Sequence, residues 1–268
     1  MPTLEIDGTT LAYDVRGQGE PILFVHGLGS CAQDWEFQVA EFSKDYQVVT
    51  FDLRGHGRSA KPRGPYTMTM FASDAAGLLR ALGIESAHVV GVSLGGGIAF
   101  QMALTFPSLV KSLVIVNSAP DATVRTLKQR LMVASRFAMV RLLGLPRVGK
   151  ALAKKLFPEP ELGGVRATFV ERFARNDRAS YLAAIRAFLG WSVLPQIGNI
   201  ACPTLVIAAD HDYTPVAVKE AYVSLIPGSK LVVIPDSKHA VPVERPQPFN
   251  AALRAFLEGQ SARPASLR

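Results

Sequence analysis

Cysteine is scarce in this chain, whose 268 residues include two, Cys31 and Cys202, far apart in the sequence. Such sparse usage excludes a disulfide framework and a cysteine-ligated metal centre, and it fits a reducing compartment. We predict that both cysteines are small buried residues. The first residues also lack a basic stretch followed by an apolar one, which is the pattern of a secretory signal. We therefore expect a cytoplasmic protein.

Long apolar runs and cofactor motifs are missing as well. The longest apolar stretch, 87–104, is rich in glycine and is interrupted by His88, Ser93 and Gln101. A strand, a turn and a helix explain it better than a membrane span. The five histidines show no helical His-x-x-x-His pairing, and no phosphate-binding glycine loop opens a strand–helix unit. We expect no metal ion and no nucleotide or flavin cofactor.

Acidic residues are sparse in one part of the chain. Residues 121–200 hold 14 of the 29 Lys and Arg but 5 of the 22 Asp and Glu. A solvated helical face is the ordinary explanation; steering of anionic substrates and contact with an acidic membrane surface are the alternatives. Because no recognition motif accompanies the charge, we do not expect nucleic acid binding.

Length and patterning suit an α/β protein. A chain of this length with 49% apolar residues fits one large domain, or a domain with a lid. Strand-like runs alternate with helical stretches, for example 47–51 before 68–82, which predicts a mainly parallel sheet covered on both faces. Between about 121 and 195 the strand signals disappear and helical spacing dominates. That spacing is seen in Leu127, Leu131, Ala134 and Ala138.

These patterns predict a division of the chain. We expect a core domain formed by residues 1–120 and 196–258 and a helical cap, or lid, formed by residues 121–195. Residues 259–268 are expected to be a loose tail.

The pentapeptide Gly91-Val92-Ser93-Leu94-Gly95 lies between the apolar run 88–90 and the helix-like stretch 96–104. This pattern is typical of a nucleophile elbow, which presents a serine hydroxyl on a sharp strand-to-helix turn. The turn also places the Leu94 amide at a helix N-terminus, where it can donate to an oxyanion. The structural alternative is a glycine-rich turn that only packs a helix on a sheet.

Partners for Ser93 follow other apolar runs. The run 21–25 ends in a glycine-containing loop, where the Leu28 amide can serve as a second oxyanion donor and His26 is expected to brace the loop. The run 230–235 leads to His239, a candidate base. An aspartate at position 210 or 212 follows the run 204–209, so the chain order is serine, acid, histidine.

These segments resemble the α/β-hydrolase superfamily over nearly the whole chain. Further resemblance lies in Asp52-Leu53-Arg54-Gly55-His56-Gly57-Arg58-Ser59 and in Glu244-Arg245-Pro246 after His239. The chain looks most like small bacterial carboxylesterases and enol-lactonases with a helical cap. The resemblance implies a mostly parallel sheet with helices on both faces and a cap inserted after the sixth strand.

The acid is chosen by comparison with that superfamily, which usually shows Gly-x-x-Asp at this strand end with a proline four residues later. Ala209 stands in place of the glycine, and the third residue after it is Asp212. Pro215 is the third residue after Asp212, so this loop is one residue shorter than in that superfamily. We predict that Asp212 is the acid, with Asp210 as the alternative and Asp121 as a distant third candidate.

The predicted reaction is hydrolysis of small to medium acyl or aryl esters through an acyl-enzyme. A serine at position 93 disfavours epoxide opening and halide removal, for which relatives generally use an aspartate. Lactone opening is the first alternative, including enol-lactones and acyl-homoserine lactones. Carbon–carbon hydrolysis of a vinylogous diketone and a non-catalytic ligand-binding protein are the others.

A small-molecule ester or lactone is the expected partner, and the sequence leaves open a monomer or a homodimer. The residues that could line its pocket are Phe137, Phe169, Phe173, Phe188, Trp191 and Val241. Burial of the cap against the core is the alternative role for the aromatic residues among them.

Overall fold

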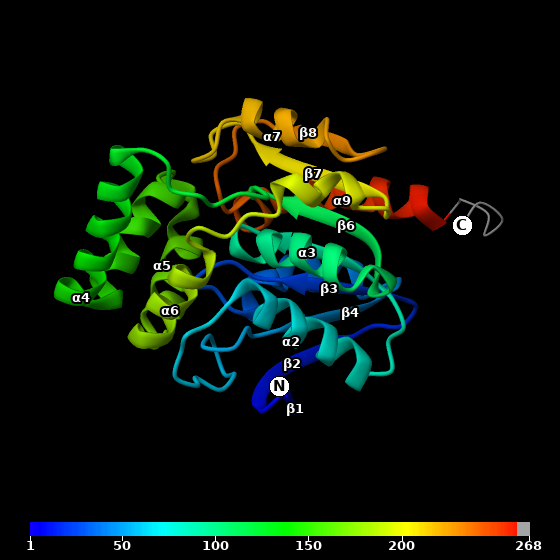
Figure 1. Ribbon diagram of the computed structural model, residues 1–268, viewed down its shortest axis with the longest axis horizontal. Coiled ribbons are helices and arrows are strands. Elements are labelled where there is room, and N and C mark those ends of the chain that lie inside the picture. Colours follow the sequence, from blue (N-terminus) through cyan, green and yellow to red (C-terminus); the bar gives the residue numbers. More distant parts are fainter. Residues whose placement is uncertain (262–268) are drawn as a thin grey trace.

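The computed structural model describes residues 1–261, which form one sheet of eight strands with helices on both faces (Figure 1). The strand order is β1-β2-β4-β3-β5-β6-β7-β8. The strands are β1 (Thr3–Ile6), β2 (Thr9–Arg16), β3 (Glu20–Val25), β4 (Tyr46–Phe51), β5 (Ala87–Val92), β6 (Val110–Val116), β7 (Thr204–Ala209) and β8 (Lys230–Ile234).

The sheet is parallel from β4 to β8, and β1 and β2 join it antiparallel at one edge. Strand β3 lies between β4 and β5, so the direction in which strands are added reverses at β3. In α/β sheets of this kind, ligands bind in the crevice beyond the carboxyl ends of the strands at this switch point. The loops that follow β3 and β5 border that crevice.

The α-helices of the described residues lie between the strands or after the last one, and they are supplemented by four short 3-10 turns. They are α1 (Glu36–Phe42), α2 (Met68–Ala81), α3 (Leu94–Thr105), α4 (Leu127–Leu156), α5 (Gly163–Ala174), α6 (Arg178–Phe188), α7 (Val216–Val223), α8 (Val241–Glu244) and α9 (Pro246–Ser261). The turns are η1 (Ala32–Trp35), η2 (Pro107–Leu109), η3 (Pro160–Leu162) and η4 (Leu194–Asn199).

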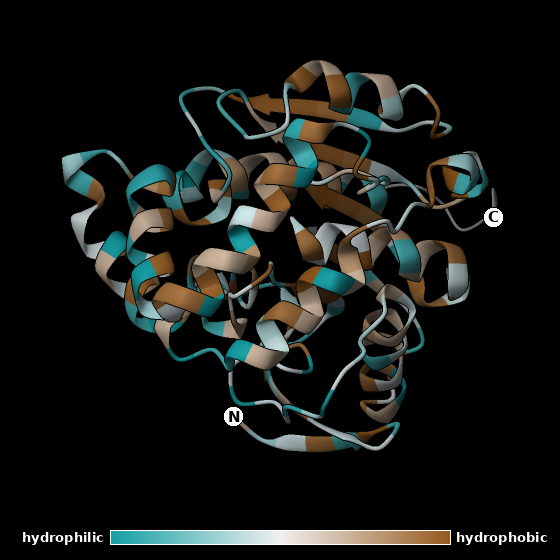
Figure 2. Ribbon diagram, turned by 60° about the vertical axis from the view of Figure 1, so that its left-hand side comes forward, coloured by the Kyte–Doolittle hydropathy of each residue, from teal (hydrophilic) through white to brown (hydrophobic). Residues whose placement is uncertain are grey.

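Two apolar cores lie on opposite faces of the sheet, because successive side chains of a strand point to opposite sides. In β3, Leu23 and Val25 face a core built with α2 and α3, whereas Ile22 and Phe24 face a core built with α1 and α9. Figure 2 colours the visible strands largely brown, in keeping with burial on both faces. The predicted mostly parallel sheet with helices on both faces is therefore confirmed.

Local signals set the helix ends. Helix α2 begins where the Thr67 hydroxyl accepts a hydrogen bond from the Met70 amide (3.1 Å), and it ends just before Gly83, whose φ is +70°. At α4, Thr126 and Gln129 form a capping box in which each side chain accepts from the backbone of the other. These polar signals agree with the apolar periodicity of the same segments.

Helices α4 to α6 lie between β6 and β7 in the chain and form a separate group beyond the carboxyl ends of these strands (Figure 1). We call residues 127–188 the helical segment. It has a small apolar core of its own, built around Val140, Phe173 and Tyr181. Arg172 ties it to the sheet domain through Asp34 (2.8 Å) and Glu36 (3.1 Å).

Four further expectations can be compared with the structure. Cys31 is buried, but Cys202 is partly exposed, so the prediction that both are buried is wrong for Cys202. Residues 259–261 belong to α9, and the rest of the tail expected over 259–268 lies outside the described residues. None of the helices within residues 1–261 combines the length and apolarity that crossing a bilayer requires. His26 braces its loop by accepting a hydrogen bond from the Leu53 amide (3.0 Å).

Candidate active site

Ser93 occupies the single residue between β5 and α3, with φ +55° and ψ −118°. A positive φ is costly for a residue with a side chain, and such strain marks sites where the surrounding structure fixes the backbone. Close packing around the turn leaves no room for a side chain at the flanking positions, Gly91 and Gly95. A Cβ on Gly91 would lie 2.2 Å from the Gly95 carbonyl oxygen, and one on Gly95 would lie 2.1 Å from the Val25 carbonyl oxygen.

Backbone hydrogen bonds hold this turn in place. The Ser93 amide donates to the Val116 carbonyl (2.9 Å), and the Ser93 carbonyl accepts from the Gly97 amide (3.1 Å) and the Ser118 hydroxyl (2.7 Å). The serine side chain therefore projects from a rigid junction of β5, β6 and α3. A nucleophile held by regular elements is positioned more precisely than one on a mobile loop.

The loop after β3 packs against this turn. A Cβ on Gly27 would lie 3.4 Å from the Ser93 Cβ, which brings the neighbouring Leu28 to the elbow. Leu94 is the first residue of α3, where amides have no partner within the helix. Among the turn and loop hydrogen bonds of the described residues, neither the Leu28 nor the Leu94 amide is a donor. The two predicted oxyanion donors thus belong to the loop and the helix that border Ser93.

Asp212 and His239 form a hydrogen-bonded pair beyond the ends of β7 and β8. The His239 Nδ1 lies 2.6 Å from the Asp212 Oδ1, and the Asp212 side chain has no exposed surface. Donation from Nδ1 to a carboxylate leaves Nε2 as the acceptor, which is the tautomer a general base needs. Within the described residues, no hydrogen bond links His239 to the Ser93 hydroxyl; such contacts are often long before substrate binds.

The second oxygen of Asp212 is taken by a lysine that the sequence analysis missed. Lys219, in α7, places its Nζ 2.5 Å from the Asp212 Oδ2 and donates to the Thr214 carbonyl (2.6 Å). Its side chain is fully buried. Burial tends to raise the pKa of Asp212, but the hydrogen bonds and charges of His239 and Lys219 hold that pKa below its ordinary value. Asp212 is therefore ionised at neutral pH.

Asn117 is a second residue that the sequence analysis missed. It directly follows β6, with φ +43°, and its side chain donates to the Lys238 and His239 carbonyls (both 3.0 Å). Its Oδ1 accepts from the Ala209 amide (2.8 Å). One buried amide thus joins the loop that carries the histidine to the strand that precedes the acid. A polar residue directly after an apolar strand was the available signal for Asn117; nothing comparable distinguished Lys219.

The other acid candidates lie elsewhere. Asp210 accepts hydrogen bonds from the Asp236 and Ser237 amides (2.9 and 3.0 Å) and so braces the loop before His239. Asp121 pairs with Arg125 at 2.6 Å. Of the three, Asp212 is the one that contacts the histidine.

Similarity to known proteins identifies the family of this chain. Residues 20–246 match the profile of the alpha/beta hydrolase fold family. The chain belongs to the α/β-hydrolase fold family.

Relatives of this α/β-hydrolase include enol-lactonases, an esterase and a putative carbamate hydrolase. It is 30% identical to 3-oxoadipate enol-lactonase 2 of Acinetobacter baylyi, over 96% of this chain and 96% of that protein. The solved enol-lactonase of Burkholderia xenovorans LB400 is similar with a TM-score of 0.89 and 26% identity, over 96% of this chain and 100% of that one. A thermophilic esterase of Thermogutta terrifontis gives 0.87 and 26%, over 97% and 99%. These similarities support a hydrolase.

The predicted pocket residues of this α/β-hydrolase fall into four settings. Phe188 and Trp191 stack on one another (5.8 Å between ring centres) and lie against α3, where a Cβ on Gly97 would be 2.9 Å from the Phe188 ring. Phe169 and Phe173 stack inside the helical segment. Phe137 lies beneath the guanidinium groups of two arginines, and Val241 is fully buried in the core beside α9. Phe188 and Trp191 therefore pack against α3, the helix that begins at the elbow.

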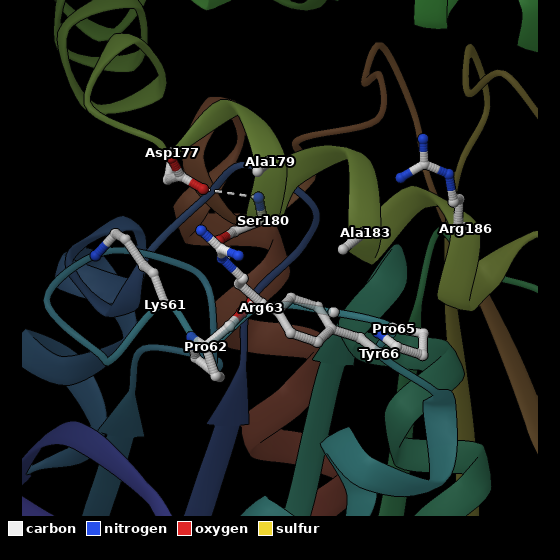
Figure 3. A pocket seen from close by; sticks show the side chains of 11 residues that line it. Lys61, Pro62, Arg63, Pro65, Tyr66, Asp177, Ala179, Ser180, Ala183 and Arg186 are labelled. Carbon is white, nitrogen blue, oxygen red and sulfur yellow. Dashed lines mark hydrogen bonds between the residues drawn. The ribbon is translucent and has the colours of Figure 1, made fainter.

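A cavity of about 630 Å³ lies between the loop 61–66 and α6 (Figure 3). None of the predicted catalytic residues lines it. Lys61, Arg63 and Arg186 supply its positive charge. Asp177, on the same rim, is committed to the N-terminus of α6, where it accepts from the Ser180 amide (2.8 Å). The cavity lies at the boundary between the part of the chain that forms the sheet and the helical segment.

Metal-ligand groups gather at one place in the described part of the chain. Asp210, His211 and Asp236 bring their ligand atoms within 4.8 Å of one another, and all three residues are exposed. Both oxygens of Asp210 already accept backbone hydrogen bonds. We assign no metal to this cluster, and the expectation of a metal-free enzyme stays a prediction.

Proposed function

We propose that this α/β-hydrolase is a serine hydrolase that cleaves carboxylic esters of small to medium acyl or aryl substrates. The observation that carries the proposal is the pairing of the buried Asp212 with His239 at 2.6 Å. Support comes from the strained elbow at Ser93 and from the hydrolase relatives. A purely structural aspartate does not need to orient the ring of a histidine that lies in a solvent-accessible loop.

The first half of the reaction forms an acyl-enzyme. His239 Nε2 takes the proton from the Ser93 hydroxyl as its oxygen attacks the ester carbonyl. Asp212 stabilises the imidazolium that results, and the Leu28 and Leu94 amides bind the oxyanion. Each such donor typically contributes about 3 kcal/mol of transition-state stabilisation. The imidazolium then protonates the leaving alkoxide, and the alcohol departs.

The second half repeats these steps with water. His239 takes a proton from water, the hydroxide attacks the acyl carbon, and the proton returns to Ser93 as the acid leaves. We propose that the segment 121–195 acts as a cap over this site, set on a core of residues 1–120 and 196–258. Phe188 and Trp191 would then form the wall of the acyl or alcohol pocket nearest α3, excluding bulk water.

Lactone hydrolysis is the second candidate, because a lactone is a cyclic ester and uses the same groups. It is favoured by the similarity to enol-lactonases. Here the leaving alkoxide stays attached to the acyl chain, so the pocket must hold both parts of the opened product. Carbon–carbon hydrolysis and a binding role are the remaining alternatives.

The test is turnover of a chain-length series of p-nitrophenyl esters beside a matched lactone panel. We expect ester hydrolysis that is lost in Ser93→Ala and retained in Ser224→Ala, since Ser224 is an exposed serine at the end of α7. Lactone opening with feeble ester turnover would move the assignment to a lactonase. Turnover that persists in Ser93→Ala would contradict the mechanism.

A further inference from the structure

Helix α4 carries large apolar side chains on its outer surface. Its first part, residues 127–143, ends where Gly144 leaves the helical conformation (φ +74°). The exposed fractions are 72% for Leu127, 62% for Leu131, 64% for Met132, 38% for Met139, 80% for Leu142 and 47% for Leu143. Single exposed apolar residues are common on proteins, but six on one short helix are not.

These six residues share one side of the helix. At 3.6 residues per turn they fall within an arc of about 160°. The opposite side faces the protein with Val140, which is fully buried, and with Phe137, which is half-buried. The more apolar side of the helix therefore faces outward, which is the reverse of the usual pattern for a surface helix.

Positive charge accompanies this apolar face. Residues 127–156 contain eight Lys and Arg and no Asp or Glu. Lys128 lies within the apolar arc, and Arg130 and Arg141 lie beyond its edge; all three are exposed. The helix thus combines a broad apolar face with a basic rim, which is the composition of helices that lie in the interface of an anionic membrane.

The place of α4 in the fold leaves this face accessible. Figure 1 shows α4 at the outer edge of the molecule, with α5 and α6 between it and the sheet. Its most extensive contacts with other elements are to α5 and α6. The first part of α4 is about 25 Å long at 1.5 Å per residue.

A second copy of the chain fits this face poorly. A symmetric pair would bring two helices of the same strongly positive charge together, with no acid on either to offset them. We propose instead that the outer face of residues 127–143 docks on an anionic lipid surface. The apolar side chains enter the acyl boundary, and Lys128, Arg130 and Arg141 meet the acidic headgroups. The proposal does not depend on the proposed hydrolase activity.

The test is co-sedimentation of the full chain with vesicles of phosphatidylcholine alone or mixed with phosphatidylglycerol. We expect binding to the mixed vesicles at least about tenfold tighter than to phosphatidylcholine, weakening as salt is added. Lys128→Gln/Arg130→Gln/Arg141→Gln is expected to lower the affinity for mixed vesicles by about a hundredfold at low ionic strength.

A second variant, Leu131→Ser/Leu142→Ser, removes two of the exposed apolar residues and is expected to lose binding by about tenfold or more. Leu225→Ser is its control, because Leu225 is 52% exposed in the turn that follows α7. Melting temperatures of all variants report folding. Absence of vesicle binding would overturn the proposal. So would a dimer in solution that Leu131→Ser/Leu142→Ser dissociates while vesicle binding is absent, since a second copy would then cover the face.

Discussion

Asp212 has both carboxylate oxygens taken by nitrogen donors, His239 on one side and Lys219 on the other. One bond sets the imidazole tautomer, and the other holds the carboxylate so that its first oxygen keeps facing the ring. The proposed chemistry depends on these two side-chain contacts, each of which is shorter than 3 Å. Two predictions concern this cluster.

Replacing Asp212 by Asn removes the ionised acceptor and favours the wrong imidazole tautomer. We expect Asp212→Asn to lower kcat by about 10⁴-fold. Asp210→Asn is the matched comparison and should retain kcat within about tenfold, because Asp210 braces backbone amides rather than the ring. Steady-state kinetics on the best ester decides; the reverse order of effects would assign the acid to Asp210.

Lys219 acts through Asp212, so it is a positioning residue. Lys219→Met should lower kcat more than it changes KM. It should also move the acidic limb of the pH–rate profile to higher pH, because Lys219 is one of the two groups that hold the pKa of Asp212 below its ordinary value. Breaking the buried pair should also lower stability by about 3–5 kcal/mol. Lys154→Met, on an exposed helical lysine, is the control. A lower melting temperature with an unmoved pH profile would leave Lys219 a purely structural role.

At the scale of elements, β5, the elbow and α3 act as one unit. The apolar runs at 21–25, 88–90, 204–209 and 230–235 predicted strands that carry the site, because buried parallel strands are continuous apolar runs. The glycine spacing predicted the turn, since the Val25 carbonyl approaches Gly95 too closely for any side chain. A short sequence pattern is sufficient to predict an element when the geometry of that one segment determines its structure.

Gly95→Ala should therefore damage the elbow. The added Cβ would lie 2.1 Å from the Val25 carbonyl oxygen and 2.7 Å from that of His26. We expect a loss of stability of about 1–3 kcal/mol together with a loss of turnover, as α3 shifts away from β3. The control is Gly163→Ala, where an added Cβ would meet nothing within 4 Å. Thermal unfolding and kinetics test both, and an intact, active Gly95→Ala would show that the close packing is not needed.

The apolar pattern of an element predicted less about which way its side chains face and which residues they contact. The spacing of Leu127, Leu131, Ala134 and Ala138 predicted a helix correctly, yet all four residues are exposed. Periodicity locates an apolar face without saying what covers it. Asn117 and Lys219 were missed for a related reason. Asn117 contacts residues about 90 or more positions away, and Lys219 contacts Asp212, 7 positions away. Those contacts exist only in the folded chain.

At the scale of the whole molecule, stability depends on pH through buried histidines. Burial lowers the pKa of His26 to about 4 and of His56 to about 3. The unfolded chain, with ordinary histidine pKa values near 6.5, binds more protons than the folded one between these limits. The free energy of unfolding should therefore fall as the pH drops below about 6.5.

His56→Asn isolates this effect. Asn keeps a donor for the Arg54 carbonyl but does not titrate, so the decline in unfolding free energy between pH 6 and 4 should be shallower by up to about 1.4 kcal/mol per pH unit. Urea unfolding of the parent protein and of the variant across this range measures the difference in slope. An equal slope in His56→Asn would mean that His56 titrates normally in the folded protein.

Burial also raises the pKa of Glu244 to about 7, which acts in the opposite direction. The folded protein then binds the extra proton between about pH 4.5 and 7, and this contribution to stability is lost as the pH rises through that range. Glu244 is present in both proteins of the His56 comparison, so its contribution cancels there.

The central claim is that Ser93 is a nucleophile activated by His239, and covalent labelling tests it most directly. A fluorophosphonate should label the folded protein at one serine, which peptide mapping should identify as Ser93, and His239→Asn should slow the labelling by orders of magnitude. Rapid loss of ester turnover should parallel the labelling. Folded protein that stays unlabelled, or that labels at Ser93 equally fast without His239, would contradict the account.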